Sequence, residues 1–221
     1  LRVSGAVDYF RIPVDPDGDD AEAEKFSLTE VLMLRWKMLT AEGAPESGER
    51  VRVIHHDRTS LGVQLLRLDV ERLRELESVL AQKSRTTKPC QPSQLKEEAL
   101  VAAQKKDSVV RGVVCTVIGK KARVYLLDYG ITETLNIDQL CDLPTEMVTQ
   151  VPIYGVRVLL DKEGLVSAEH GSLIPNENTS LTNRIVRLGW LSPRTLTTVW
   201  ARLLSIGEWN PGLENFTTRI I

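Results

Sequence analysis

From residue 100 onward, hydrophobic and polar positions alternate along short segments, and this period of two predicts β-strands. Two further apolar segments before residue 70 are separated by a polar turn and are also predicted strands. The close spacing of the strands after residue 100, with Gly112 inside one of them, indicates a small and strongly bent barrel. The predicted strands are Val51–His55, Leu61–Leu68, Leu100–Gln104, Val109–Val117, Ala122–Leu127, Thr132–Ile137 and Tyr154–Leu160.

Apolar residues at helical spacing predict helices in other parts of the chain. Ser27 and Glu30 have the spacing of a capping box, before a helix that runs to about Thr40 and is apolar on nearly all sides. Asp69 is placed to cap a second helix, which precedes a polar linker at Lys83–Ser93. The apolar stripe of this second helix is Val70, Leu73, Leu76, Val79 and Leu80. Two more helices are predicted around Thr182–Leu188 and Ser192–Leu204.

Composition and charge are those of an ordinary soluble domain. The formal net charge is −2, from 28 basic and 30 acidic residues, and 42% of the residues are hydrophobic. A nucleic-acid binder usually has a basic surplus, so binding to a phosphate backbone is disfavoured. No apolar run approaches the roughly 20 residues that span a bilayer, and the first residues do not resemble a signal peptide. Because residue 1 is not methionine, we expect an internal segment of a longer protein.

The sequence offers weak candidates for a metal site or a catalytic centre, and we expect no cofactor. Cys90, Cys115 and Cys141 have no CxxC spacing, so we expect free thiols rather than a zinc site. The acidic segment 15–24 lacks the glycine and glutamate that a calcium loop needs at its sixth and twelfth positions. His55 and His56 are interpreted as polar residues at a strand end. No set of carboxylates and arginines suits a nuclease.

Residues 100 to 160 contain the most specific motif of the chain. Arg111-Gly112 lies in one predicted strand, Asp128-Tyr129-Gly130 ends the next, and Leu143-Pro144 follows. This order and spacing resemble a Tudor domain, and the flanking elements resemble its extended form. The resemblance implies a mainly β fold with helices (α+β), in which an SH3-like Tudor barrel and a staphylococcal-nuclease-like OB-type domain are joined by a linker helix.

The same resemblance implies a division of the chain into four parts. Residues 1–50 are expected to form an N-terminal extension that contains the helix at 27–40. Residues 51–95 are the first part of the nuclease-like domain with its linker, residues 96–145 the Tudor barrel, and residues 146–221 the second part of the nuclease-like domain.

Family members with a complete site bind methylated arginine in an aromatic cage, whose ring faces attract the cation. Matched position by position, the four aromatic positions and the asparagine of that cage fall on Gln104, Val110, Leu126, Tyr129 and Ile131. Only Tyr129 keeps the expected residue type. Since a single ring cannot surround a dimethylated head group, the resemblance implies a cage-deficient domain with an apolar mouth.

We therefore expect Tyr129 to stack on an unmodified arginine, with a carboxylate of Asp128, Glu133 or Asp107 as the ion-pair partner. Arg111 and Asp128 are also expected to form a structural ion pair between neighbouring strands. Gly130 is expected to serve a turn with positive φ rather than a ligand.

The function implied by the resemblance is that of a non-catalytic scaffold domain. Its partner would be the arginine-rich N-terminal tail of a Piwi-family protein, bound between the Tudor barrel and the nuclease-like half. Its expected location is cytoplasmic, in the perinuclear germ granule (nuage) of the germline RNA-silencing pathway. The alternatives are a reader of symmetric dimethylarginine, an RNA-binding OB-type module and a purely structural or dimerising domain.

Overall fold

The computed structural model describes the helical residues Leu32, Met33, Arg35, Trp36 and Leu39 and most of the chain from residue 48 onward. The ranges described there are 48–57, 60–68, 70–93, 95–105, 108–144, 146–149, 151–161, 180–193 and 195–209. The acidic segment 15–24, the capping-box residues Ser27 and Glu30, and Asp107 lie outside the described residues. The five helical residues near Arg35 agree with the helix predicted to end at about Thr40.

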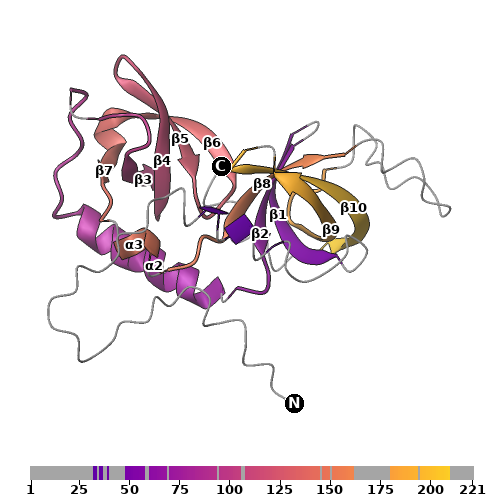
Figure 1. Ribbon diagram of the computed structural model, residues 1–221. Coiled ribbons are helices and arrows are strands. Elements are labelled where there is room, and N and C mark those ends of the chain that lie inside the picture. The colour runs from indigo at the N-terminus through magenta and orange to yellow at the C-terminus, as the bar shows by residue number, and fades with distance from the viewer. Residues whose placement is uncertain are drawn as a thin grey trace, which may run out of the picture.

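Five strands form a closed barrel in the order β1-β2-β8-β10-β9. Its strands come from two separate parts of the sequence, as the colours in Figure 1 show. Alternate residues of each strand point inward, so that Val53, Val63, Val158 and Leu188 are buried in one hydrophobic core. The strands are β1 (Glu49–Asp57), β2 (Ser60–Leu65), β8 (Gly155–Leu160), β9 (Arg184–Pro193) and β10 (Thr198–Trp209).

A second, five-stranded sheet is inserted into the barrel sequence between β2 and β8, with the order β6-β5-β4-β3-β7. We call it the inserted sheet. It has a core of its own, built from alternate residues such as Val101, Val114, Val124 and Leu126. Its strands are β3 (Leu100–Lys105), β4 (Ser108–Ile118), β5 (Lys121–Leu126), β6 (Ile131–Asn136) and β7 (Leu140–Asp142), with a 3-10 turn at Ile137–Gln139.

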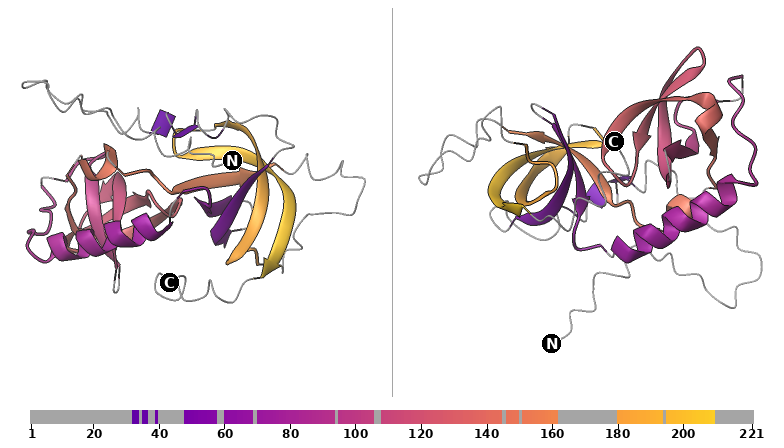
Figure 2. Two further views of the ribbon diagram at one scale, coloured as in Figure 1. Left: turned by 90° about the horizontal axis from the view of Figure 1, so that it is seen from below. Right: turned by 180° about the vertical axis from the view of Figure 1, so that it is seen from behind.

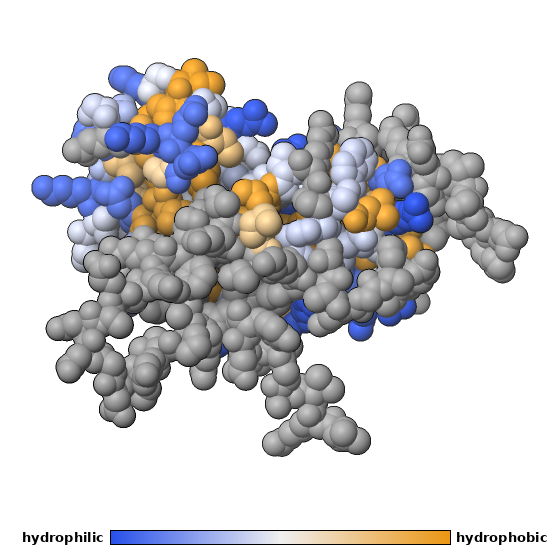
Figure 3. All heavy atoms as spheres, in the orientation of Figure 1, coloured by the Kyte–Doolittle hydropathy of each residue, from blue (hydrophilic) through white to orange (hydrophobic). Residues whose placement is uncertain are grey.

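Helix α2 (Val70–Ser84) leads from the barrel into the inserted sheet, and the short helix α3 (Glu146–Thr149) lies on the return path. The ribbon views show α2 running along one side of the inserted sheet (Figures 1 and 2). Leu73, Leu76 and Leu80 are buried at helical spacing, as predicted, and the opposite side of the helix is exposed. Val79, predicted in the same stripe, is 40% exposed. On the face seen in Figure 3, hydrophilic residues project from the inserted sheet with apolar residues between them.

The mainly β fold with helices is confirmed, and seven predicted strands correspond to β1, β2, β3, β4, β5, β6 and β8. The helices predicted at Thr182–Leu188 and Ser192–Leu204 are wrong, because β9 occupies Arg184–Pro193 and β10 begins at Thr198. Val186 and Leu188 are buried on either side of the exposed Arg187, which is a strand pattern. Backbone pairing of β9 with β1 and of β10 with β8 closes the barrel, and this long-range constraint decides the structure.

The barrel and the inserted sheet meet at a close backbone contact. Gly130, in the turn between β5 and β6, has a φ of +66°, as expected. A Cβ atom at this position would lie 2.2 Å from the carbonyl oxygen of Val156 on β8. Gly155 donates a backbone hydrogen bond to the carbonyl of Leu127 at 3.0 Å. The contact therefore requires glycine at position 130 for its conformation and for its lack of a side chain.

We predict that Gly130→Ala lowers the free energy of unfolding by about 3 kcal/mol or more, because a left-handed conformation and a backbone clash add together. Gly119→Ala is the matched control. Gly119 has a φ of +61°, but nothing lies within 4 Å of its Cβ position. It should lose only about 1 kcal/mol, from the conformation alone. Urea unfolding of both variants is the measurement, and equal losses would contradict the close contact.

Candidate functional site

The motif residues Arg111 and Asp128 form a buried ion pair with two parallel hydrogen bonds. Arg111 Nε donates to Asp128 Oδ2 at 2.9 Å, and Arg111 Nη2 donates to Asp128 Oδ1 at 2.6 Å. The Arg111 side chain is fully buried. This confirms the expected structural ion pair, which joins β4 to the turn that follows β5.

The same pair also holds the chain that returns to the barrel. Arg111 Nη1 donates to the carbonyls of Met147 and Val151, at 2.6 and 2.9 Å, and Nη2 donates to that of Pro152. Asp128 Oδ1 accepts a hydrogen bond from the backbone N–H of Tyr154 at 3.2 Å. The polar atoms of Arg111 and Asp128 are therefore engaged within the fold, which leaves Asp128 poorly placed to pair with a ligand arginine.

Tyr129 lies between the inserted sheet and α2. Tyr129 is only 4% exposed, and its hydroxyl donates a hydrogen bond to the Glu77 carboxylate on the helix. Burial raises the pKa of the Tyr129 hydroxyl, and the neighbouring Glu77 carboxylate raises it further. The ring therefore presents little surface for the stacking that the sequence predicted.

The other predicted site residues divide into buried and exposed ones. Val110 and Leu126 are buried in the same core as Tyr129, and the half-buried Ile131 packs against that core. Gln104 is exposed and lies outside this cluster, opposite Val109 on β4. Glu133 forms an ion pair with Lys105. The structure thus brings four of the five cage positions together as core packing.

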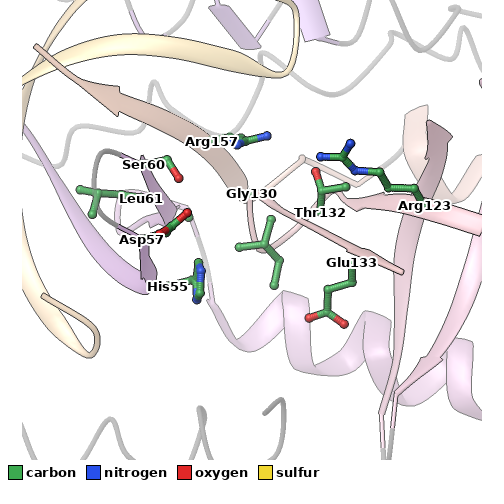
Figure 4. A pocket seen from close by; sticks show the side chains of 11 residues that line it. His55, Asp57, Ser60, Leu61, Arg123, Gly130, Thr132, Glu133 and Arg157 are labelled. Atoms are coloured by element: carbon green, nitrogen blue, oxygen red, sulfur yellow. The ribbon is translucent and has the colours of Figure 1, made fainter. Parts of the chain in front are cut away.

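A pocket of about 290 Å³ lies at the junction of the barrel and the inserted sheet, and we call it the junction cleft. Figure 4 shows side chains from both units facing it. Acidic side chains line it on β1 and β6, and basic side chains line it on β5 and β8. The lining residues are His55, Asp57, Ser60, Leu61, Gly62, Arg123, Gly130, Ile131, Thr132, Glu133 and Arg157.

Sequence reasoning missed most of the charged residues of this cleft. Asp57, Arg123 and Arg157 lie on three strands that are far apart in the sequence, and no spacing pattern links them. Glu133 was predicted, and His55 was noted only as a polar residue at a strand end. Neighbouring His56 accepts a hydrogen bond from the backbone N–H of Leu181, and burial lowers its pKa.

The described part of the chain contains no group of three His, Cys, Asp or Glu residues suited to hold a metal ion. The three cysteines are free, as expected. Burial, together with Asp142, raises the pKa of the Cys90 thiol to about 12. Among the described helices, none has the length and apolar character needed to cross a membrane.

A family model described as Tudor domain matches residues 47–162, just over half of the 221 residues. The chain therefore belongs to the Tudor domain family, as the motif around Asp128-Tyr129-Gly130 predicted. No protein with a curated description matches the chain.

Solved structures of Tudor and of extended Tudor domains have a fold similar to that of this chain. One is the human TDRD1 extended Tudor domain in complex with a symmetrically dimethylated peptide, which is 17% identical in sequence to this chain. The superposition has a TM-score of 0.55 and covers 74% of this chain and 84% of the TDRD1 domain. The extended Tudor domain of Drosophila melanogaster Tudor-SN is 22% identical with a TM-score of 0.52, covering 77% and 90%. A complex of Tudor with Aubergine carrying an me2s arginine is 20% identical with a TM-score of 0.53, covering 71% and 92%.

We predict that Arg111→Lys lowers the free energy of unfolding by about 3–5 kcal/mol, because lysine cannot replace the forked hydrogen bonds to a buried carboxylate. Arg74→Lys is the matched control, since Arg74 bonds both oxygens of Glu71 on the exposed side of α2. It should cost at most about 1 kcal/mol. Chemical denaturation of both variants is the measurement. Similar small losses of unfolding free energy in both would show that the buried Arg111–Asp128 pair contributes little to stability.

We also predict a pH dependence that originates at Glu77. Burial raises the pKa of this carboxyl above its ordinary value of 4.5, so the folded state binds the proton more tightly than the unfolded state. The contribution of Glu77 to stability is then fully present below pH 4.5 and is lost as the pH rises through the folded-state pKa. Urea unfolding from about pH 4 to about pH 8 should show Glu77→Gln gaining stability relative to the wild type as the pH rises.

The matched control is Glu75→Gln, at an exposed position of the same helix. The difference in unfolding free energy between Glu75→Gln and the wild type should change little over the same pH range. If Glu77→Gln behaves in the same way, the Glu77 carboxyl is not held in a buried environment.

Proposed function

We propose that this chain is a non-catalytic, peptide-binding extended Tudor domain that recognises arginine-rich tails of Piwi-family proteins without requiring arginine methylation. It would serve as a scaffold module in a Piwi-pathway protein of the Krimper-like, cage-deficient kind, located in the cytoplasm at perinuclear germ granules. The family membership supports a binding role. Complexes with a similar fold, of Tudor with Aubergine and of mouse TDRD1 with a dimethylated MILI peptide, support this class of partner.

The observation that carries the proposal is the chemistry of the junction cleft. Its lining contains the carboxylates of Asp57 and Glu133 but no phenylalanine, tyrosine or tryptophan among the described residues. A methylated guanidinium gains affinity from aromatic ring faces, whereas an unmodified guanidinium gains it from paired hydrogen bonds to a carboxylate. The lining therefore favours the unmodified side chain.

Asp57 is the better placed of the two carboxylates. It lies at the end of β1, where Figure 4 shows its side chain at the cleft, and it has no ion-pair partner within the part of the chain that the structure describes. Glu133 already shares its charge with Lys105. A peptide arginine in the cleft can donate two hydrogen bonds to Asp57, with Glu133 as a second negative charge nearby.

Methylation would weaken this mode of binding rather than strengthen it. Each methyl group replaces or crowds an N–H donor that a carboxylate uses, and the described lining offers no ring face in return. The Tyr129 ring could contribute only if its hydroxyl left Glu77 and the side chain left its buried position. An equal or lower affinity for methylated peptides is therefore the signature of the proposed site.

The experiment is calorimetric titration with one arginine-rich peptide in three forms: unmodified, symmetrically dimethylated and asymmetrically dimethylated. We expect the unmodified form to bind at least as tightly as the other two. Asp57→Asn should weaken binding of the unmodified peptide by about 10- to 100-fold, because it removes the charged acceptor of the guanidinium hydrogen bonds. Binding of only the dimethylated forms would overturn the proposal.

The matched control for charge is Asp138→Asn. Asp138 is exposed in the 3-10 turn after β6, outside the cleft lining. Its substitution removes the same formal charge and should leave the affinity within about twofold. Equal losses in the two variants would mean that the effect of Asp57 is only a general charge effect.

A further inference from the structure

Two arginine side chains face each other across one end of the junction cleft. Arg123 comes from β5 of the inserted sheet and Arg157 from β8 of the barrel. Figure 4 shows the guanidinium groups pointing toward one another, with the Thr132 hydroxyl beside that of Arg123. Two like charges are thus held at one place by a strand of the inserted sheet and a strand of the barrel.

The strand pairing gives neither arginine an acidic neighbour. The residues opposite Arg123 are Thr116 on β4 and Thr134 on β6. The residues opposite Arg157 are Gly62 on β2 and Thr198 on β10. Within the described residues neither guanidinium has an ion pair, whereas other basic side chains do, as in the pairs Arg67–Glu49 and Arg202–Asp161.

The Cys115 thiol on β4 gives a second indication that the two charges act at one place. Burial raises the pKa of this thiol overall, but both Arg123 and Arg157 oppose that rise through their positive charge. One exposed side chain therefore lies within electrostatic reach of both guanidinium groups. The arginine pair creates a local positive region in a chain whose formal net charge is −2.

We propose that Arg123 and Arg157 together bind an anionic side chain of the peptide, either a phosphorylated serine or threonine or an aspartate or glutamate. Two guanidinium groups from different strands can share one phosphate or carboxylate through charge-assisted hydrogen bonds. The Thr132 hydroxyl, beside Arg123 in Figure 4, can donate to the same anion.

This inference rests on the proposed function, since the anion would belong to the peptide whose arginine binds Asp57. The cleft lining holds the carboxylates of Asp57 and Glu133 as well as the guanidinium groups of Arg123 and Arg157, so a bound chain meets both signs of charge. A peptide can carry both signs of charge within a few residues. A nucleic acid carries only phosphates, which the two carboxylates would repel, so the observations favour a peptide.

The test compares three versions of the same unmodified arginine peptide, with serine, glutamate or phosphoserine placed in turn at each of several positions on both sides of the arginine. At one position we expect phosphoserine to bind about tenfold tighter than serine, with glutamate in between. In the double variant Arg123→Gln, Arg157→Gln the affinity ratio of phosphoserine to serine peptide should fall to about 1. Calorimetry or fluorescence anisotropy gives the ratio.

Arg72→Gln is the matched control, at an exposed position of α2 outside the cleft. It removes one positive charge and should keep the ratio close to that of the wild type. Raising the salt concentration should lower the ratio in the wild type, because the added contact is ionic. A ratio that survives the double variant would show that the anion binds elsewhere and would overturn the assignment.

The outcomes separate this inference from the proposed function. If the serine peptide binds but no position shows a gain with phosphoserine or glutamate, the anion site is wrong and the proposed function stands. If no arginine peptide binds, the proposed function fails, and a titration with inorganic pyrophosphate, followed by NMR at the side-chain Nε–H groups of Arg123 and Arg157, tests the anion site alone. Shifts there would support the site and their absence would overturn it. Tighter binding of a short RNA through the same arginines would overturn its assignment to a peptide.

Discussion

The structure depends on one buried ion pair between Arg111 and Asp128. A guanidinium removed from water is costly unless its N–H groups find acceptors, and here the Asp128 carboxylate and the carbonyls of Met147, Val151 and Pro152 supply them. These acceptors come from the inserted sheet and from the segment that returns to the barrel. The requirement to satisfy one cation therefore fixes how the two units meet, and with it the shape of the junction cleft.

This constraint also changes what the motif means for binding. Tyr129 follows Asp128 directly, so the turn that presents Asp128 to Arg111 places the neighbouring ring against α2, where Glu77 accepts its hydroxyl. Val110 and Leu126 fill the adjacent core. Residues that resemble a binding site in the sequence thus stabilise the fold, while the polar chemistry lies on the strands around the junction cleft. The same cleft supplies both carboxylates and guanidinium groups.

The sequence predicted the elements whose pattern is local and unambiguous. The leucine stripe of α2 specifies a helix and the short apolar segments of β3, β4 and β5 specify strands, and the structure has these elements; β3 and β4 are buried over consecutive positions. Leu181, Ile185 and Leu188 also fit a helical spacing, so the sequence around β9 predicts a helix. The backbone pairing of β9 with β1 makes this segment a strand. The cleft could not be predicted, because Asp57, Arg123 and Arg157 meet only through strand pairing. Nor could the burial of Tyr129, since its partner Glu77 is 52 positions away.

The insertion of one unit into the other has a consequence for the order of folding. The barrel strands β2 and β8 pair Gln64 with Gly155, and the whole inserted sheet lies between them in the chain. Joining these strands across an unstructured loop of that length would cost considerable loop entropy and would slow folding. A sheet that has already folded on α2 brings its own two ends close together and removes much of this cost. An inserted unit that folded first would hold β2 and β8 near each other and would so favour closure of the discontinuous barrel.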